Sequence, residues 1–381
     1  MIYLDNAATT AVLPEVLEKM KPFFMEDFAN PAALYAPARA AGAAVEESRQ
    51  IIAGTLGAGP DEIYFTSGGS ESDNWAVKAV SIAAGQSDKR RIITSAIEHP
   101  AIINTCRFLA RQGFPVTYLP ADAAGRVDPE ELEKSIGDDT CLVSVMTANN
   151  ETGVIQPVRE LCQIAHRHGA LFHTDAVQAY GHIPLDVKDL GVDFLSASGH
   201  KFHGPKGVGF LYIRRGVSVG PLIHGGSQER NRRAGTSNVP GIVGMGEAAR
   251  IAAENLTETQ EKVSRLRDYL IRRVTDEIPG TRLTGGQAER LPGHAHFCFR
   301  SLDGETILIL LDERGICASS GSACTTGAVE VSHVLRAMRV DPEYIRGALR
   351  LTLSSQNTKE ETDKTVDALK EITARLYGMT L

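Results

Sequence analysis

Residues 196–209 read SASGHKFHGPKGVG, and this stretch decides how the chain is organised. The apolar runs DFLSAS at 193–198 and GVGFLYI at 207–213 predict two short buried strands. Lys201 therefore lies on the connection between two strands. A lysine flanked by Ser, Gly and His at a strand end can form a Schiff base with a carbonyl cofactor when burial lowers its pKa. The alternative for a lone lysine is a solvated loop residue.

The composition is that of a soluble globular protein. The chain has 381 residues, of which 43% are hydrophobic and 23% charged, enough for a sizeable core and two domains. Its net charge of −7 argues against nucleic-acid and anionic-membrane partners. The N-terminus lacks the features of a signal peptide, and no apolar run approaches the roughly 18 residues of a membrane span. We therefore expect a cytoplasmic protein.

Six cysteines are too few for a disulfide scaffold, and none belongs to a C-x-x-C pair. Five are expected to be inert core thiols: Cys106, Cys141, Cys162, Cys298 and Cys317. The pairs His166/His168 and His294/His296 are not completed by further ligands, so no resident metal site is expected.

Strand and helix signals alternate through the first two thirds of the chain. Further strands are expected at 62–67, 91–95, 116–120, 141–147 and 170–175. Helices are expected at 14–24, 36–56, 71–84, 101–111, 129–135 and 158–168. About seven strands joined by helices predict an α/β fold with a mostly parallel sheet covered on both faces.

Beyond Gly244 the pattern changes. One long amphipathic helix is expected at 245–274, with a break near Glu258. Strands at 295–299 and 348–353 and helices at 304–313 and 359–376 predict a smaller α+β domain. The boundary is expected near residue 256.

Three segments at predicted strand ends suit a phosphorylated pyridine cofactor. The small residues of Ser67-Gly68-Gly69-Ser70 open a helix, where backbone N–H groups can approach a phosphate. Asp175 ends a strand, where its carboxylate can pair with a protonated pyridine nitrogen. Lys201 follows one crossover later. Taken singly, the first segment is alternatively a turn with an N-cap, and Asp175 is alternatively a helix cap. Taken together with Lys201, the two segments indicate pyridoxal phosphate chemistry.

Cys324 lies in ASSGSACTTGA at 318–328, a segment made almost entirely of small residues. Such a segment buries little surface and loses much entropy on ordering, so we expect an exposed, mobile loop. That setting suits a reactive thiol, although a linker cysteine without a role is the alternative.

These stretches resemble the cysteine desulfurases of the NifS/IscS kind, in the class-V aminotransferase family of fold-type-I pyridoxal phosphate enzymes. The matching stretches are YLDNAATT at 3–10, FTSGGSESDN at 65–74, EHPA at 98–101, NNETG at 149–153, HTDAVQ at 173–178, SGHKFHGPKGVG at 198–209, RAGTSN at 233–238 and SSGSACTTG at 319–327. The resemblance implies a large domain at 14–256 with a seven-stranded sheet. It further implies a small domain at 1–13 and 257–381 that carries the mobile Cys loop, and a homodimer.

The resemblance also implies roles for single residues. Lys201 would bind the cofactor covalently, Asp175 would contact its pyridine nitrogen, and His99 would stack on its ring. Asn150 and Gln178 would lie near the ring hydroxyl. The phosphate ligands would be Gly69, Ser70, Ser198 and His200, with Thr236 from the other subunit. On the residues alone, His99 could equally be a helix-start or core histidine.

For the reaction, the resemblance implies that Arg350 and Asn150 bind the substrate L-cysteine, with Arg350 clamping its carboxylate. The Cys324 thiolate would attack the substrate sulfur and keep it as a persulfide while alanine leaves. A free thiol is only a few per cent ionised at neutral pH, so we expect His99 or the substrate to deprotonate it. The sulfur would pass to an acceptor protein such as an iron–sulfur scaffold, where the Cys324 persulfide could transiently contact a cluster.

Two features depart from the family pattern, and two other functions compete. Ala33-Leu34-Tyr35 stands where the family usually has Ser-x-His, and the chain ends at Leu381, which favours a NifS-type enzyme or another acceptor. The long Cys loop favours the NifS/IscS branch over the branch that includes selenocysteine lyases.

An aminotransferase would need Lys201 but no mobile Cys324. A catalytically idle scaffold-binding partner would be colourless.

Overall fold

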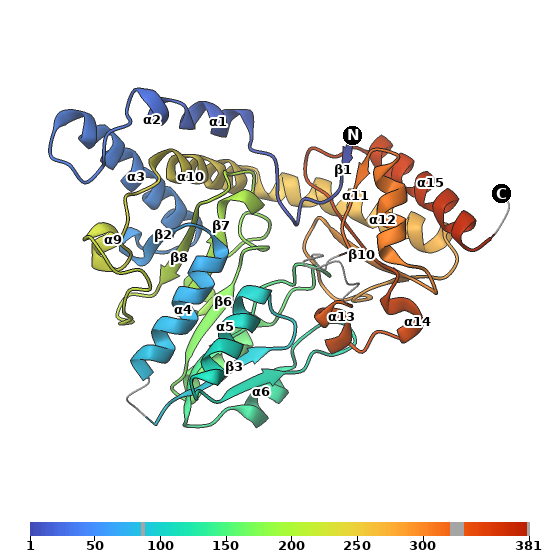
Figure 1. Ribbon diagram of the computed structural model, residues 1–381, viewed down its shortest axis with the longest axis horizontal. Coiled ribbons are helices and arrows are strands. Elements are labelled where there is room, and N and C mark those ends of the chain that lie inside the picture. Colours follow the sequence, from blue (N-terminus) through green and yellow to red (C-terminus); the bar gives the residue numbers. More distant parts are fainter. Residues whose placement is uncertain (85–87, 321–330, 379–381) are drawn as a thin grey trace.

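The computed structural model describes residues 1–84, 88–320 and 331–378. Its centre is a seven-stranded sheet in the order β2-β8-β7-β6-β5-β3-β4 (Figure 1). The strands are β2 (Ile63–Thr66), β3 (Arg91–Ser95), β4 (Val116–Leu119), β5 (Thr140–Ser144), β6 (Leu171–Asp175), β7 (Phe194–Ser198) and β8 (Gly209–Ile213). β8 runs antiparallel to both of its neighbours, β2 and β7, and the other pairings of these strands are parallel. The predicted α/β fold with a mostly parallel seven-stranded sheet is therefore confirmed.

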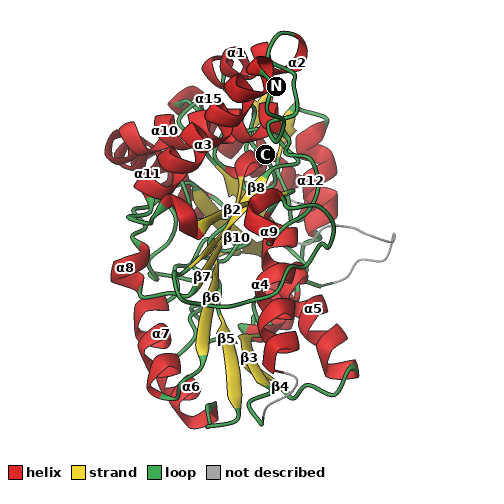
Figure 2. Cartoon of the chain, turned by 90° about the vertical axis from the view of Figure 1, so that its left-hand side faces the viewer, coloured by secondary structure: helices red, strands yellow, loops and turns green. Residues whose placement is uncertain are grey.

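Helices cover both faces of this sheet, because its central strands are apolar on both sides (Figure 2). One face carries α4 (Gly69–Ala84) and α5 (Pro100–Arg111), which pack around the fully buried Trp75. The other face carries α6 (Pro129–Ser135), α7 (Val158–Arg167) and α8 (Val187–Leu190), with α3 (Ala36–Thr55) and α10 (Val239–Glu254) continuing the layer. The helices α3 to α7 each begin within two residues of a predicted helix, whereas α8 was not predicted and α10 begins before the helix expected at 245–274.

The C-terminal third builds a second sheet in the order β12-β10-β9, from β9 (Thr281–Leu283), β10 (His294–Phe299) and β12 (Ala348–Thr352). The helices α11 (Leu256–Glu277), α12 (Gly304–Asp312) and α15 (Lys359–Leu376) pack on it around a separate core. At the N-terminus, β1 (Ile2–Tyr3) pairs with β11 (Ile316–Cys317) in a separate two-stranded sheet, and a bridge from Asp5 to Thr352 brings the start of the chain beside β12. The division into two domains at residue 256 stays a prediction.

Two long helices predicted from the sequence are each divided in the structure. The stretch at 245–274 belongs to α10 and α11, which meet at Asn255, three residues before the expected break. The stretch at 14–24 forms α1 (Pro14–Met20) and α2 (Pro22–Met25). Pro22 lacks an N–H and is tolerated only in the first turn of a helix, so the chain starts a new helix there. The short helices α9 (Gln228–Asn231), α13 (His333–Ala337) and α14 (Pro342–Ile345) complete the described elements.

The topology brings the predicted chemical residues to one place. The parallel strands β5, β6 and β7 end at the same edge of the central sheet, and loops after them face the second sheet (Figure 1). In the part of the chain that the structure describes, every helix is too short or too polar to cross a membrane.

Candidate functional site

A cavity of about 850 Å³ lies between the carboxyl ends of these strands and β12. Ten residues singled out from the sequence line it: Gly69, Ser70, His99, Asn150, Asp175, Gln178, Ser198, His200, Lys201 and Arg350. Its size is typical of a site for a small molecule or a cofactor. Residues far apart in the sequence therefore converge on one site.

Lys201 lies at the end of a short 3-10 helix (Gly199–Lys201) that directly follows β7. Its Nζ donates to the carbonyl oxygens of Ala7, at 2.6 Å, and Ala8, at 2.8 Å. Burial and the nearby charge of Arg350 lower the pKa of the amine to about 8. The amine is therefore partly neutral near neutral pH, and only the neutral amine is a nucleophile.

Asp175 supplies a buried carboxylate on the same cavity. It ends β6, is 5% exposed, and its Oδ1 accepts a hydrogen bond of 2.9 Å from the backbone N–H of Val177. Burial raises its pKa, while His99 and Lys201 oppose that rise. A cationic group bound in the cavity would stabilise the ionised carboxylate further.

His99 is held in one tautomer by the helix that it starts. Its Nδ1 accepts a hydrogen bond of 3.1 Å from the backbone N–H of Ala101, so the side chain caps α5. Because Nδ1 is the acceptor, the neutral ring carries its proton on Nε2. Burial lowers the pKa of the ring, which favours this neutral form.

The end of the cavity at the start of α4 suits an anion. Gly69 and Ser70 begin α4, a helix of 16 residues whose N-terminal N–H groups attract negative charge. A Cβ at Gly69 would lie 2.5 Å from Cγ2 of Val177, so only glycine fits there. Ser198 and His200 complete this end together with Ser70. The His200 ring is neutral, because burial lowers its pKa to about 4, and its Nδ1 lies 3.1 Å from Oγ1 of Thr9.

Arg350 brings a buried cation to the cavity from β12. It is 4% exposed; its Nη1 donates to the Asn150 carbonyl oxygen and its Nη2 to Oδ1 of Asp5, both at 2.8 Å. Its Nε has no hydrogen-bond partner within the described residues. A planar guanidinium held at two corners can present its remaining N–H groups to a ligand carboxylate.

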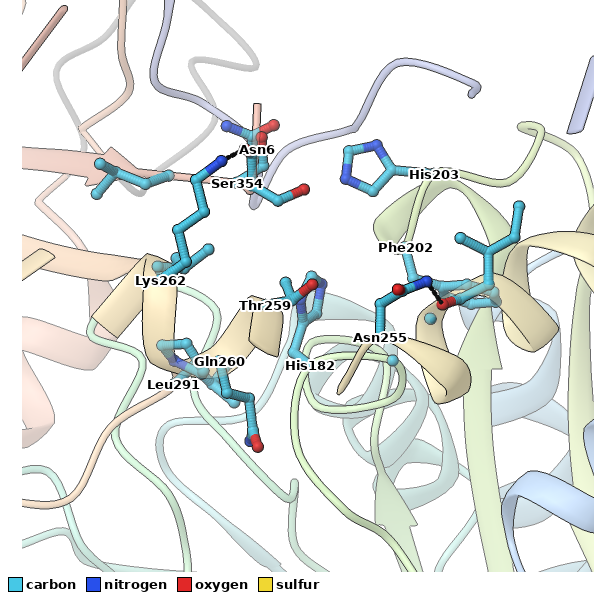
Figure 3. Close-up of a pocket in the computed structure, with 18 of the residues that line it drawn as sticks. Asn6, His182, Phe202, His203, Asn255, Thr259, Gln260, Lys262, Leu291 and Ser354 are labelled. Atoms are coloured by element: carbon cyan, nitrogen blue, oxygen red, sulfur yellow. Dashed lines mark hydrogen bonds between the residues drawn. The ribbon is translucent and has the colours of Figure 1, made fainter. Parts of the chain in front are cut away.

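A second cavity, of about 570 Å³, adjoins the first at Ala7 and Gln178. Figure 3 shows residues that line this second cavity. His182 lines this cavity, and its Nε2 lies 2.9 Å from the backbone oxygen of Lys201. His203 lies across the cavity from Lys262 in Figure 3. The second cavity therefore backs the turn that carries Lys201.

One predicted site residue within the described ranges, Thr236, does not line the cavity. Thr236 is exposed on the loop before α10 and lines neither this cavity nor the adjoining one at Ser67–Ser70, so its predicted contact across subunits stays a prediction. Cys324 falls at 321–330, outside the described residues. Four of the expected core thiols, Cys106, Cys141, Cys162 and Cys298, are buried, whereas Cys317 is half-buried on β11.

Sequence reasoning missed several cavity residues. They are Asp5, Asp73, Glu151, His333 and Arg336, with the buried Glu98 beside them. Asp73 could have been found, because it lies four residues after Gly69 and so on the same face of the helix. In the described ranges no group of three or more His, Cys, Asp or Glu residues is arranged to hold a metal ion.

Glu98 yields a prediction about stability and pH. It is fully buried, and burial raises its pKa from 4.5 to about 8. The folded state therefore keeps a proton that the unfolded state loses between these pH values, so stability falls as pH rises through this window. Glutamine has no such proton. We expect the stability of Glu98→Gln relative to wild type to increase from pH 4.5 to pH 8, by up to about 4 kcal/mol.

Urea unfolding of both proteins at a series of pH values measures this difference. Glu47→Gln, at an exposed position on α3, is the matched control and should show little change with pH. A difference between Glu98→Gln and wild type that stays constant over the window would show that Glu98 is ionised in the folded protein.

Comparisons with known proteins agree on one family. The sequence model described as class-V aminotransferases matches residues 2–365. A protein named cysteine desulfurase IscS, from Methanosarcina thermophila, is 50% identical over 379 residues, covering 100% of this chain and 93% of its own. A cysteine desulfurase from Nostoc is 45% identical over 380 residues, with 100% and 94% covered.

Solved structures give the same result. A structure titled NifS-like protein superposes with a TM-score of 0.92 at 42% identity, covering 98% of this chain and 99% of its own. A structure titled SspA in complex with cysteine superposes with a TM-score of 0.83 at 37% identity, covering 94% and 100%.

Proposed function

The chain belongs to the class-V aminotransferase family and, within it, to the cysteine desulfurases, and on that premise we propose how its residues bind the cofactor and carry the sulfur. Members of this family are pyridoxal phosphate enzymes. The enzyme converts L-cysteine to L-alanine and passes the sulfur on, in the role of IscS proteins for iron–sulfur cluster assembly. The observation that carries the proposal is the meeting of Lys201, Asp175 and Arg350 in one cavity.

The residues of the cavity fit pyridoxal phosphate. Neutral donors for a phosphate come from the N-terminus of α4 and from Ser198 and His200. Gly69 has no side chain that would fill this space. Asp175 offers a buried carboxylate, and Lys201 offers an amine of lowered pKa. Gln178 is held in place because its Nε2 donates to the Ala7 oxygen at 2.9 Å. When bound, the cofactor supplies an electron sink for the bonds at the substrate α-carbon.

Each residue then has a defined task. Lys201 would hold the cofactor through its Nζ, the amine of lowered pKa on the cavity. Asp175 stabilises a protonated pyridine nitrogen, which keeps the ring electron-withdrawing. Arg350 binds the substrate carboxylate with Asn150 beside it. His99 would stack on the ring, and its Nε2–H suits it to deliver a proton rather than to take one from a thiol.

The sulfur step is assigned to Cys324. Its thiol first loses a proton, for which the substrate amine is a better acceptor than His99 in the tautomer described above. The thiolate forms an S–S bond with the substrate sulfur while the C–S bond breaks. The electron pair stays on carbon, which then takes a proton and becomes the methyl group of alanine. Cys324 is left as a persulfide and passes this sulfur to an acceptor.

Incubation with L-cysteine tests the function. We expect alanine and sulfur, trapped as persulfide or released as sulfide by a thiol, in equal amounts and without an added keto acid. Formation of a keto acid, with alanine only when pyruvate is supplied, would identify an aminotransferase instead. A purified protein without a visible cofactor band would contradict the proposal as a whole.

Arg350 gives a prediction about substrate binding. Arg350→Lys keeps the charge but loses the paired N–H donors, so we expect KM for L-cysteine to rise roughly 10- to 100-fold with the visible cofactor band unchanged. Steady-state kinetics measure it. Arg346→Lys, at an exposed position before the same strand, is the control. An unchanged KM in Arg350→Lys would remove Arg350 from the substrate site.

The remaining parts of the proposal concern the assembly. We propose a homodimer in which Thr236 of one protomer reaches the phosphate bound by the other, an iron–sulfur scaffold or similar acceptor as partner, and a cytoplasmic location. The exposed position of Thr236 supports the contact between subunits.

A further inference from the structure

A second carboxyl group lies on the same cavity as Asp175 and has no assigned role. Asp73 is on α4, one turn after Gly69, and is 1% exposed. It lines the cavity together with Asp175. Its Oδ1 is buried without a hydrogen-bond partner, and among the described residues no lysine or arginine forms an ion pair with it. A buried carboxyl group in such surroundings is costly to ionise.

Asp73 stands at one end of a chain of buried hydrogen bonds. Its carboxyl group lies beside the side chain of Ser196 on β7, and its Oδ1 lies 3.7 Å from Nε2 of His173. Oγ of Ser196 lies 2.9 Å from Nε2 of His173, and Nδ1 of His173 lies 2.8 Å from Oγ of Ser144. His173 is fully buried, and burial lowers the pKa of its ring to about 3, so the ring is neutral.

A neutral imidazole has one N–H, so this chain of hydrogen bonds has two possible directions. With a proton on Asp73, Asp73 donates to Ser196, Ser196 donates to Nε2 of His173, and Nδ1–H of His173 donates to Ser144. With Asp73 ionised, every donor points the other way. The second arrangement buries a charged Asp73 carboxylate whose Oδ1 accepts no hydrogen bond. In the first arrangement Asp73 is uncharged.

The neighbours of Asp73 favour the uncharged arrangement. Groups facing it come from β6, β7 and the connection from β3 to α5: Asp175, His173, Ser196 and Glu98. Two of these are carboxyl groups, and adjacent buried carboxyl groups do not all ionise. Asp175 is the carboxyl group more easily ionised, because the N–H of Val177 donates to it and because Lys201 and His99 stabilise its charged form.

We propose that Asp73 is an un-ionised carboxylic acid in the working enzyme and acts as a positioning residue for Asp175. Of these two carboxyl groups, Asp175 alone then carries a negative charge. Its proton fixes the direction of the chain through Ser196 and His173, the residues that flank Asp175 on β6 and β7. This assignment rests on the proposed function only in that Asp175 pairs with the cofactor nitrogen.

Infrared difference spectroscopy of the holoenzyme at neutral pH tests the protonation directly. We expect the spectrum of wild type minus Asp73→Asn to contain the C=O stretching band of an un-ionised carboxylic acid. Asparagine keeps the shape of Asp73 and a donor for Ser196. The pH midpoint of the visible cofactor band should therefore move by less than about 0.3 unit.

Asp73→Ala tests whether the donor matters. We expect it to weaken retention of pyridoxal phosphate roughly 10-fold, with Asp73→Asn restoring wild-type retention, because only alanine leaves Ser196 without its donor. Asp175→Asn is the contrasting variant, and it should shift the cofactor band and abolish most activity.

Carboxylate bands in the difference spectrum, or a cofactor midpoint moved by about one unit or more in Asp73→Asn, would overturn the proposal. Equal damage from Asp73→Asn and Asp73→Ala would also overturn it. A holoenzyme without a visible cofactor band would instead refute the proposed function, and the infrared comparison would still report the protonation state of Asp73.

Discussion

Replacing Cys324 with alanine is expected to leave a coloured enzyme that binds L-cysteine and forms almost no persulfide or sulfide. The other cavity residues are unchanged, so the visible cofactor band should remain. Without the thiolate no nucleophile attacks the substrate sulfur, and the rate of sulfur release should fall at least about 10³-fold. Sulfide release with a thiol reductant, measured beside the cofactor spectrum, checks both statements.

Cys317→Ala is the matched control for this variant. Cys317 is a half-buried thiol on β11, seven residues before Cys324, and no step of the reaction depends on it. We expect it to keep near wild-type sulfide release. Normal turnover by Cys324→Ala would remove Cys324 from the mechanism, and an equal loss in both variants would point to a structural effect.

Replacing Lys201 with alanine is expected to abolish turnover through a different defect. The cavity keeps Asp175 and the phosphate end, so pyridoxal phosphate should still bind, but without a covalent bond to the protein. Borohydride treatment should then fix no cofactor to the chain, whereas it should do so in wild type at Lys201. We expect alanine formation to fall at least about 10³-fold.

Lys201→Arg separates the charge of Lys201 from its nucleophilicity, and Lys188→Ala is the control. Arginine keeps a cation near Ala7 and Ala8 but is not a nucleophile, so it should be as inactive as alanine. Lys188 lies on α8, away from the cavity, and its replacement should have no effect. Borohydride fixation of the cofactor at another lysine would contradict the assignment.

Much of the fold was predictable because the signals are local. Short apolar runs followed by Gly, Ser or Asp marked the strands of the central sheet, and the predicted helix at 129–135 coincides with α6. The breaks inside the two long predicted helices were harder to locate, because apolar spacing continues across Pro22 and Asn255. The antiparallel direction of β8 was not predicted either, since strand direction depends on pairing rather than on composition.

The site was predictable where function depends on residues at strand ends. Lys201, Asp175 and the segment around Gly69 are such residues, and the structure brings them to one cavity. Contacts that depend on tertiary packing were not predictable. The ion pair of Arg350 with Asp5 joins residues 345 positions apart. The backbone carbonyl oxygens that accept hydrogen bonds from Lys201 belong to the N-terminal segment.

The pKa shifts were also beyond the sequence, because they follow from burial. Glu98 and Asp73 read as ordinary acidic residues in EHPA and FTSGGSESDN. In the structure both are sealed from solvent, and burial raises the pKa of each. The same effect lowers the pKa of Lys201, which makes it the amine suited to hold a carbonyl cofactor.

In the proposed mechanism a buried amine, Lys201, binds the cofactor, and a thiol elsewhere in the chain, Cys324, carries the sulfur. Peptide mass mapping of the enzyme after one addition of L-cysteine, without reductant, tests this most directly. We predict that the peptide containing Cys324 gains the mass of one sulfur atom, and that Lys201→Ala abolishes this gain. Sulfur found on another cysteine, or on Cys324 in equal amount in Lys201→Ala, would contradict the account.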